Sequence, residues 1–262
     1  MGLAFTEHAM GFFRGRVVCA VALCAPLVAL AQHQPSSYAR EKRWAEEIVP
    51  SLVVGEAVWL EAPRTEKFLG IYTEVKDAKR AIILAHGLGV HPDHGLIGQL
   101  RTRLADAGYT TLSIQMPILA ADAPAARYPV LFWEADARFA AALTFLRRKR
   151  YDKVVLVSHS MGSRMANHYV VAHPRVPLSG WISLSISNGE FPGLKRTSFP
   201  VFDVYAEKDL DEVLKGAPKR AAALKRTRGS SQAMVFGADH HFARKEKQLV
   251  SLIRLLLEGE GK

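Results

Sequence analysis

The sequence contains only two cysteines among its 262 residues, Cys19 and Cys24. Both lie in the apolar stretch 17–31, which has the pattern of a cleaved signal peptide. A mature chain without cysteine cannot form a disulfide, supply a thiol nucleophile or bind a metal through thiolates. Its stability must therefore come from a packed hydrophobic core.

The stretch 17–31 is also too short to cross a membrane. It has 15 uncharged residues, whereas a spanning helix needs roughly 20. Two arginines precede it and Ala-Leu-Ala ends it, in the order expected of a secretory signal: positive, apolar, then small residues. The sequence predicts a signal peptide over residues 1–31 and a periplasmic or secreted protein without a transmembrane domain after cleavage. An uncleaved anchor and a true start at Met10 are the alternatives.

Acidic residues are outnumbered, with 25 Asp and Glu against 35 Lys and Arg and a formal net charge of +10. The basic residues cluster at 40–43, 147–153 and 219–228. Basic surfaces attract polyanions. For an exported protein we expect an anionic envelope surface, and no nucleic acid, as the partner of these clusters. Solvated helix faces are the simpler explanation of the same pattern.

No repeat, linker or low-complexity segment interrupts the chain after Ser37. Residues 32–50 are expected to form an N-terminal helix or linker, and residues 51–262 one α/β domain. Apolar runs of strand length alternate there with segments of helical periodicity, which predicts a doubly wound, mostly parallel sheet. Two runs joined by a turn predict an antiparallel hairpin at its edge. The predicted strands are 52–62, 67–75, 81–87, 110–117, 153–158, 178–186, 200–206 and 231–237, and the predicted helices are 38–49, 95–108, 131–149, 161–173, 210–226 and 242–258.

A strand-to-helix turn at Ser160 is the first sign of chemistry. The run Ser158-His159-Ser160-Met161-Gly162 nearly matches the G-x-S-x-G elbow that carries a serine nucleophile, but Ser158 replaces the first glycine. The elbow strains the serine backbone, so the residues two before and two after it must be small. Ser160 is the predicted nucleophile, with a helix N-cap as the alternative. Because the departure is one hydroxymethyl group, we expect a Ser158→Gly variant to retain or improve activity.

A serine nucleophile needs a histidine base that is oriented by a carboxylate. Functional groups of an open parallel sheet lie beyond the carboxyl ends of its strands. Asp209 follows the predicted strand 200–206, and His240 follows 231–237, in the order serine, acid, histidine. We therefore expect Asp209 as the acid and His240 as the base, with Asp211 and His241 as alternates.

Two backbone amides are needed to bind the oxyanion of a tetrahedral intermediate. One is expected from Met161, directly after the nucleophile, and the other from Leu88 in the loop after the strand that begins at Ala81. Gly87 allows the backbone to approach the substrate closely, and His86 is expected to shape the loop.

Taken together, these motifs resemble the α/β-hydrolase superfamily, in particular small bacterial serine esterases and lipases. The resemblance rests on His86-Gly87, the run 158–162, PVFDVYAEKD and GADHHF, and it spans about residues 50 to 258. The segment 86–117 also looks like an uncharacterised exported bacterial branch of that superfamily. The resemblance implies an α/β-hydrolase fold, an ester-cleaving Ser-Asp-His triad and an oxyanion hole.

No large cap domain is expected, because only residues 187–199 separate two predicted strands where the superfamily often inserts one. The segment 118–133 is the expected wall of an acyl or aryl pocket in an open site that favours short esters. Its wall-forming side chains are Pro124, Tyr128, Leu131, Phe132 and Trp133.

Other chemistries have less support. His91, Asp93 and His94 are suitable metal ligands, but the loop offers nothing to complete a site. Gly87-Leu88-Gly89 is similar to a dinucleotide motif, but Pro92 occupies its third glycine position. We therefore expect no cofactor and no metal. Ester hydrolysis is the predicted function. The alternatives are acyl transfer or amide cleavage on an envelope component, and an inactive hydrolase-like binding protein.

Overall fold

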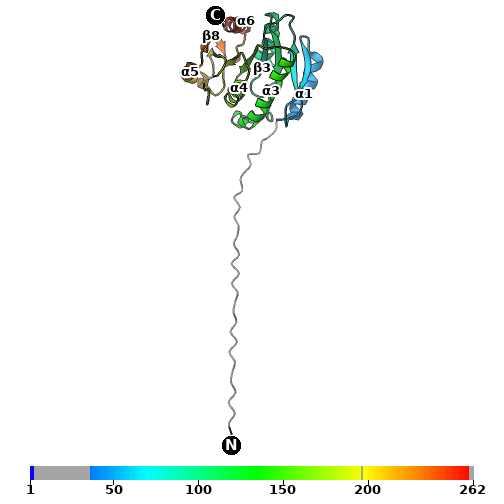
Figure 1. Ribbon diagram of the computed structural model, residues 1–262, viewed down its shortest axis with the longest axis vertical. Helices are drawn as coiled ribbons and strands as arrows, with labels where there is room; N and C mark the ends of the chain where they lie inside the picture. Colours follow the sequence, from blue (N-terminus) through cyan, green and yellow to red (C-terminus); the bar gives the residue numbers. More distant parts are fainter. Residues whose placement is uncertain (3–35, 196, 260–262) are drawn as a thin grey trace. The chain divides into compact units, whose positions relative to one another are not determined.

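The computed structural model describes residues 1–2, 36–195 and 197–259, so nearly all of the predicted signal peptide lies outside the described residues (Figure 1). Residues 36–259 contain one eight-stranded sheet with the order β1-β2-β4-β3-β5-β6-β7-β8. The strands are β1 (Glu56–Leu60), β2 (Phe68–Thr73), β3 (Ala81–Ala85), β4 (Thr110–Ile114), β5 (Val154–His159), β6 (Gly180–Leu184), β7 (Val201–Lys208) and β8 (Ser231–Asp239).

The sheet is parallel from β4 to β8, and β2 runs antiparallel to both of its neighbours. Ala85 of β3 lies opposite both Ile114 of β4 and Ser158 of β5, so the central strands end at the same edge. The mostly parallel sheet and its edge hairpin confirm the predicted fold class.

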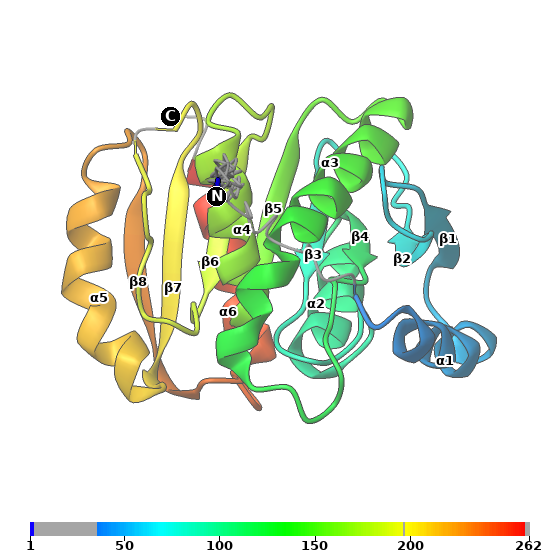
Figure 2. The same cartoon turned by 90° about the horizontal axis from the view of Figure 1, so that it is seen from below.

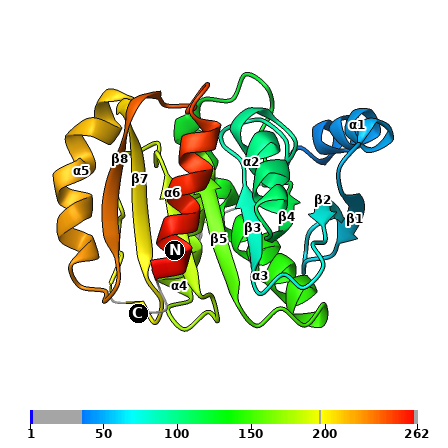
Figure 3. The ribbon, with the colours of Figure 1, turned by 90° about the horizontal axis from the view of Figure 1, so that it is seen from above.

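Helices cover both faces of this sheet, as the views from below and above show (Figures 2 and 3). One face carries α3 and α4, and the other carries α2 and α6. No described helix is long and apolar enough to cross a membrane. The helices are α1 (Tyr38–Ile48), α2 (Gly95–Asp106), α3 (Phe132–Arg148), α4 (Met161–Ala172), α5 (Asp211–Leu224) and α6 (Glu246–Glu258), with short 3-10 helices η1 (Val49–Ser51) and η2 (Ala125–Leu131).

The central strands are buried along their whole length because helices pack on both sides. Every residue of β3 is buried, as is every residue of β5. Alternate side chains point into two separate cores: Ile83 and Leu156 face α3 and α4, while Leu84 and Val157 face α2 and α6. This double coverage explains why these segments read as continuous apolar runs.

Two elements begin four residues later than the sequence predicts, and the other differences in element bounds are smaller. The last helix begins at Glu246 rather than 242, because one Asp239 carboxylate oxygen accepts the amides of His241 and Ala243 and holds the chain in a turn. The first strand begins at Glu56 rather than 52, because Gly55 has a φ of 82° and turns the chain into the strand.

Candidate active site

Three of the predicted side chains meet at the carboxyl edge of the sheet. Ser160 directly follows β5, Asp209 follows β7, and His240 follows β8. The Nε2 atom of His240 lies 3.0 Å from Ser160 Oγ, and its Nδ1 atom lies 2.6 Å from Asp209 Oδ1. A carboxylate can only accept, so Nδ1 carries the proton and Nε2 is left to accept the Ser160 hydroxyl.

Ser160 adopts the strained backbone of an elbow. Its φ of 54° and ψ of −115° lie in a region that residues with a side chain rarely occupy. A Cβ atom at residue 162 would lie 2.8 Å from the Ala85 carbonyl oxygen and closer still to that of His86, so Gly162 lets α4 start against the end of β3. The strain holds Ser160 at the tip of the turn, where it lines a cavity.

Ser158 has partners that the sequence did not reveal. Its hydroxyl accepts the Trp181 indole N–H at 2.9 Å and lies 3.0 Å from Ser163 Oγ. Ser163 in turn donates to the Ser158 carbonyl at 2.8 Å. All three residues are buried. The hydroxymethyl group is therefore accommodated beside the elbow by a closed set of hydrogen bonds.

The Asp209 carboxylate is surrounded by donors. Its Oδ2 atom accepts the Ala206 amide at 2.9 Å and the Ser185 hydroxyl, and its Oδ1 atom accepts the Leu210 amide at 2.9 Å as well as His240. Burial alone would raise the pKa of Asp209, but these hydrogen bonds outweigh it and hold the pKa below the usual value. No sequence motif indicated Ser185, which contacts Asp209 from the end of β6.

The loop that carries His240 is fixed by a second histidine. His159 Nε2 donates to the His240 carbonyl at 2.8 Å, and burial lowers the pKa of His159 to about 4, so the ring is neutral. The two alternates take no part in these hydrogen bonds. Asp211 is exposed and pairs with Lys215 at 3.1 Å. His241 is exposed and makes no ring hydrogen bond to any described residue.

The predicted oxyanion loop lies directly beside the elbow. A Cβ atom at Gly87 would lie 3.3 Å from the Cβ of Ser160. The amides of Leu88 and Met161 have no hydrogen-bond acceptor among the described residues, and both residues line the Ser160 cavity. His86 is buried, and its Nε2 accepts the Met116 amide at 2.9 Å, which leaves Nδ1 to donate to the Gly87 carbonyl at 2.9 Å. Burial lowers the pKa of His86 to about 3, so it braces the loop as a neutral ring.

Helix α1 contributes a further brace through Arg40. Its guanidinium donates to the Gly89 carbonyl at 2.9 Å and to the Leu119 carbonyl at 3.1 Å, and it stacks over Trp44 at 4.4 Å. One side chain thus joins the oxyanion loop to the segment that follows β4. The sequence placed Arg40 only in a basic cluster, because its partners are carbonyls far along the chain.

The Ser160 cavity has a volume of about 640 Å³ and lies at the carboxyl edge. Leu88, Leu96, Ile97 and Leu210 form much of its apolar wall. The expected wall 118–133 contributes only Ala125. Its larger side chains are not among those that line the cavity, and Tyr128 and Leu131 lie in the core instead. The cavity is therefore formed mainly by the loop after β3, the start of α2 and the elbow between β5 and α4.

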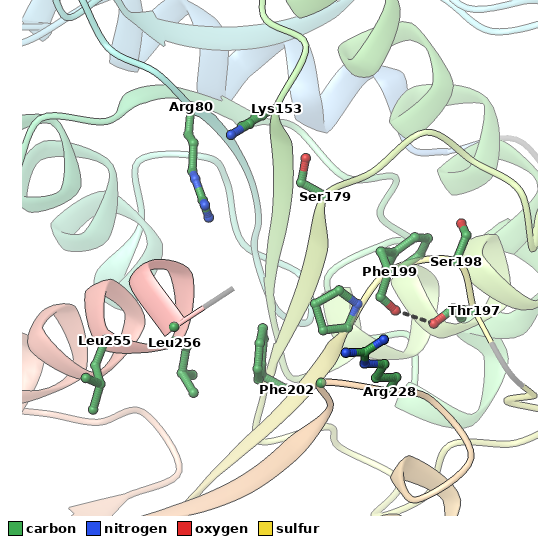
Figure 4. Close-up of a pocket in the computed structure, with 13 residues that line it drawn as sticks. Arg80, Lys153, Ser179, Thr197, Ser198, Phe199, Phe202, Arg228, Leu255 and Leu256 are labelled. Carbon is green, nitrogen blue, oxygen red and sulfur yellow. Dashed lines mark hydrogen bonds between the residues drawn. The ribbon is translucent and has the colours of Figure 1, made fainter. Parts of the chain in front are cut away.

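A larger hollow, of about 800 Å³, lies at the opposite, amino edge of the sheet (Figure 4). Arg80, Lys153 and Arg228 line it together with hydroxyl side chains, among them Ser179 and Ser198. The predicted acid and base are absent from its lining. Two of the three basic clusters, 147–153 and 219–228, end at this hollow, so the basic edge and the Ser160 edge are opposite ends of the same sheet.

The carboxylate of the possible metal site at His91, Asp93 and His94 is already paired with an arginine in the structure. Asp93 Oδ1 accepts Arg101 Nε at 2.5 Å, and the His91 and His94 rings meet edge to face with their centres 5.3 Å apart. The described residues contain no group of three or more side chains suited to hold a metal ion.

Solved structures with the same architecture include proteins that are named as hydrolases. Est1E from Butyrivibrio proteoclasticus, in a structure with ferulic acid bound, has a TM-score of 0.64 and 11% identity over 78% of this chain and 99% of its own. A serine hydrolase without lid from Xanthomonas campestris has a TM-score of 0.63 and 14% identity over 79% and 95%. A dienelactone hydrolase from Anabaena variabilis has a TM-score of 0.63 and 18% identity over 78% and 96%.

The chain has the α/β-hydrolase fold. The expected lack of a large cap holds for the described residues, since residues 185–195 and 197–200, between β6 and β7, contain no helix. At these identities the likeness establishes the fold, and the function has to be argued from the site.

Part of the chain is similar to a protein family that has no assigned function. Residues 17–131 match a family model described as a protein of unknown function, DUF3530. The matched stretch includes the predicted oxyanion loop at Gly87 and Leu88 and ends before Ser160. A search of curated proteins gives no match.

Proposed function

We propose that this protein is a serine hydrolase that cleaves carboxylic esters through an acyl-enzyme on Ser160. The observation that carries the proposal is the chain of two hydrogen bonds from Ser160 through His240 to Asp209, which are 3.0 and 2.6 Å long. The amides of Leu88 and Met161, which have no acceptor among the described residues, would supply the electrostatic part of such a site.

Each residue has a defined role in the proposed reaction. Ser160 Oγ attacks the acyl carbon while His240 Nε2 takes its proton, and the amides of Leu88 and Met161 bind the oxyanion. His240 then gives the proton to the leaving alcohol. Water, deprotonated by the same nitrogen, attacks the acyl-enzyme and releases the acid, which restores Ser160. Asp209 keeps the imidazole in the required tautomer and stabilises the imidazolium.

The surroundings of Ser160 support a small ester as substrate. The cavity is apolar around the serine and open to solvent at the carboxyl edge, and the described residues form no cap over it. The names of the structural neighbours, which include an esterase from Thermogutta terrifontis, point the same way. Transfer to another acceptor, or cleavage of an amide, would use the same residues with a different nucleophile or leaving group.

A fluorophosphonate probe tests the proposal directly, because it reacts with an activated serine. Wild-type protein should be labelled, and Ser160→Ala should not. Ser198→Ala is the matched control: Ser198 is exposed and lines the hollow at the opposite edge, so this variant should label like the wild type. Absence of labelling, together with no hydrolysis of short p-nitrophenyl esters, would favour the inactive binding protein.

An acyl-chain series then tests the size of the site. The described residues form no cap that would enclose a long acyl chain, so kcat/KM should fall as the acyl chain lengthens. A clear preference for long acyl chains would contradict the open-site argument.

A further inference from the structure

Arg164 lines the Ser160 cavity and has no polar partner among the described residues. It follows Ser160 by one turn of α4 and lines the same cavity. Its guanidinium carbon lies 5.7 Å from the centre of the Phe132 ring. Within the part of the chain that the structure describes, the side chain makes no hydrogen bond and no ion pair. Burial lowers the pKa of Arg164, and no neighbouring carboxylate offsets that effect.

The buried arginines elsewhere in the fold are all neutralised. Arg101 pairs with Asp93 at 2.5 Å, Arg138 with Glu134 at 2.5 Å, and Arg220 with Asp203 at 2.8 Å. A partly buried charge is unfavourable unless something pairs with it. At the other three positions the fold supplies the anion. At Arg164 the group that could supply it is a molecule in the cavity.

A second unpaired group lines the same cavity. The Ser187 hydroxyl is buried and has no hydrogen-bond partner among the described residues. Ser187 belongs to the loop after β6, and this loop packs along α4, where Asn167 Nδ2 donates to the Pro192 carbonyl at 2.8 Å. Arg164 and Ser187 therefore come from neighbouring elements and present donors to one space.

We propose that Arg164 binds a carboxylate on the substrate, with Ser187 as an additional donor, so that the preferred esters carry a negative charge on their acyl or alcohol part. The inference rests on the proposed ester hydrolysis at Ser160. Guanidinium and carboxylate match as a planar pair that shares two hydrogen bonds. Glu212, the acidic side chain in the cavity lining, is exposed at the start of α5 and is not paired with Arg164.

Two pairs of esters test the proposal, each differing by one carboxylate. On the acyl side, the monomethyl ester of adipic acid is compared with methyl hexanoate. On the alcohol side, 4-acetoxybenzoate is compared with phenyl acetate. In at least one pair, the wild type should hydrolyse the anionic ester with the higher kcat/KM, by tenfold or more, and that pair identifies the side of the ester that Arg164 binds.

Variants then assign the preference to Arg164. Arg164→Gln should lower the ratio of anionic to neutral kcat/KM by roughly 10- to 100-fold, which is what a charged hydrogen bond contributes. Arg164→Lys keeps the charge but lacks the planar guanidinium that can share two hydrogen bonds with a carboxylate, so it should recover part of the ratio. It also provides a folded variant if Arg164→Gln is unstable. Ser187→Ala should lower the ratio severalfold. The matched control is Arg175→Gln, an exposed arginine beyond the end of α4, which removes the same charge and should leave the ratio unchanged.

The outcomes separate this inference from the proposed function. If the probe labels Ser160 and neutral esters are cleaved, but neither pair shows a preference for the anion, the carboxylate site is refuted and the hydrolase remains. An anion preference that survives in Arg164→Gln, or that falls equally in Arg175→Gln, would also refute it. If neither labelling nor hydrolysis occurs, the proposed function itself fails.

Discussion

Removal of the Ser158 hydroxyl should destabilise the fold more than it impairs chemistry. The hydroxyl accepts the indole N–H of Trp181 at 2.9 Å, and both residues are fully buried. Ser158→Ala leaves that N–H without an acceptor in a site closed to water. The elbow backbone needs only a small residue at position 158, so the geometry of Ser160 should persist in the alanine variant.

The expected loss follows from the number of groups left unpaired. A buried donor without an acceptor costs about 1–3 kcal/mol. Ser163 keeps the Ser158 carbonyl as an acceptor at 2.8 Å, so it adds little. Ser158→Gly should lose about 0.5–1 kcal/mol more, because glycine gives up more backbone freedom on folding. The elbow motif predicts that Ser158→Gly retains activity. Because this variant should be less stable, we expect the activity only in the fraction of molecules that stay folded.

Urea unfolding followed by far-ultraviolet circular dichroism measures the effect as a fall in midpoint at constant m-value. Trp181→Phe removes the donor, so in the double variant with Ser158→Ala the two losses should be less than additive by about 1 kcal/mol or more. Ser198→Ala, an exposed serine, is the control. If Ser158→Ala were as stable as the wild type, the hydrogen bond would have no energetic importance. If it lost activity without losing stability, Ser158 would act on the elbow itself.

The contacts of Arg40 with the oxyanion loop predict that Arg40→Gln lowers kcat on a short ester by about tenfold with little change in KM, and that Arg40→Lys recovers part of it. Asp209→Asn should lower kcat/KM by roughly 10³- to 10⁴-fold. The pKa of Asp209 is lower in the folded protein than in the unfolded chain, where it is near 3.9, so ionised Asp209 stabilises the fold above about pH 3.9. This contribution is lost as the pH falls through the lower pKa of the folded protein. Urea unfolding should therefore show the stability difference between wild type and Asp209→Asn narrowing below about pH 4. The basic amino edge should bind vesicles that contain phosphatidylglycerol, and Lys153→Glu with Arg228→Glu should weaken sedimentation with them; equal binding to neutral vesicles would contradict this.

The order of strands and helices could be predicted because the sheet is buried on both faces. Segments such as 81–85 and 154–157 must then be continuously apolar, and the helices between them must be amphipathic. Boundaries were less predictable where a single side chain decides them. Asp239 delays the start of α6 by capping a turn, and nothing in the apolar periodicity after it signals that turn.

The meeting of Ser160, Asp209 and His240 could also be predicted, because parallel strands bring their carboxyl ends to one edge. The groups that position these residues could not. Ser185 reaches Asp209 from β6, and His159 reaches the His240 carbonyl across 81 positions of sequence. Such contacts depend on where side chains point in three dimensions, and no short motif records them.

The two small positions of the elbow, 158 and 162, differ in whether they tolerate a side chain, because their three-dimensional surroundings differ. At Gly162 a side chain would meet the backbone carbonyls at the end of β3, which cannot move without disturbing the central sheet. At Ser158 the side chain points between β5, β6 and α4, where Trp181 and Ser163 offer polar atoms to it. A hydroxymethyl group is therefore compatible with position 158 and not with position 162. The missing first glycine is therefore weak support for an inactive protein, whereas a substitution at Gly162 would be strong support for one.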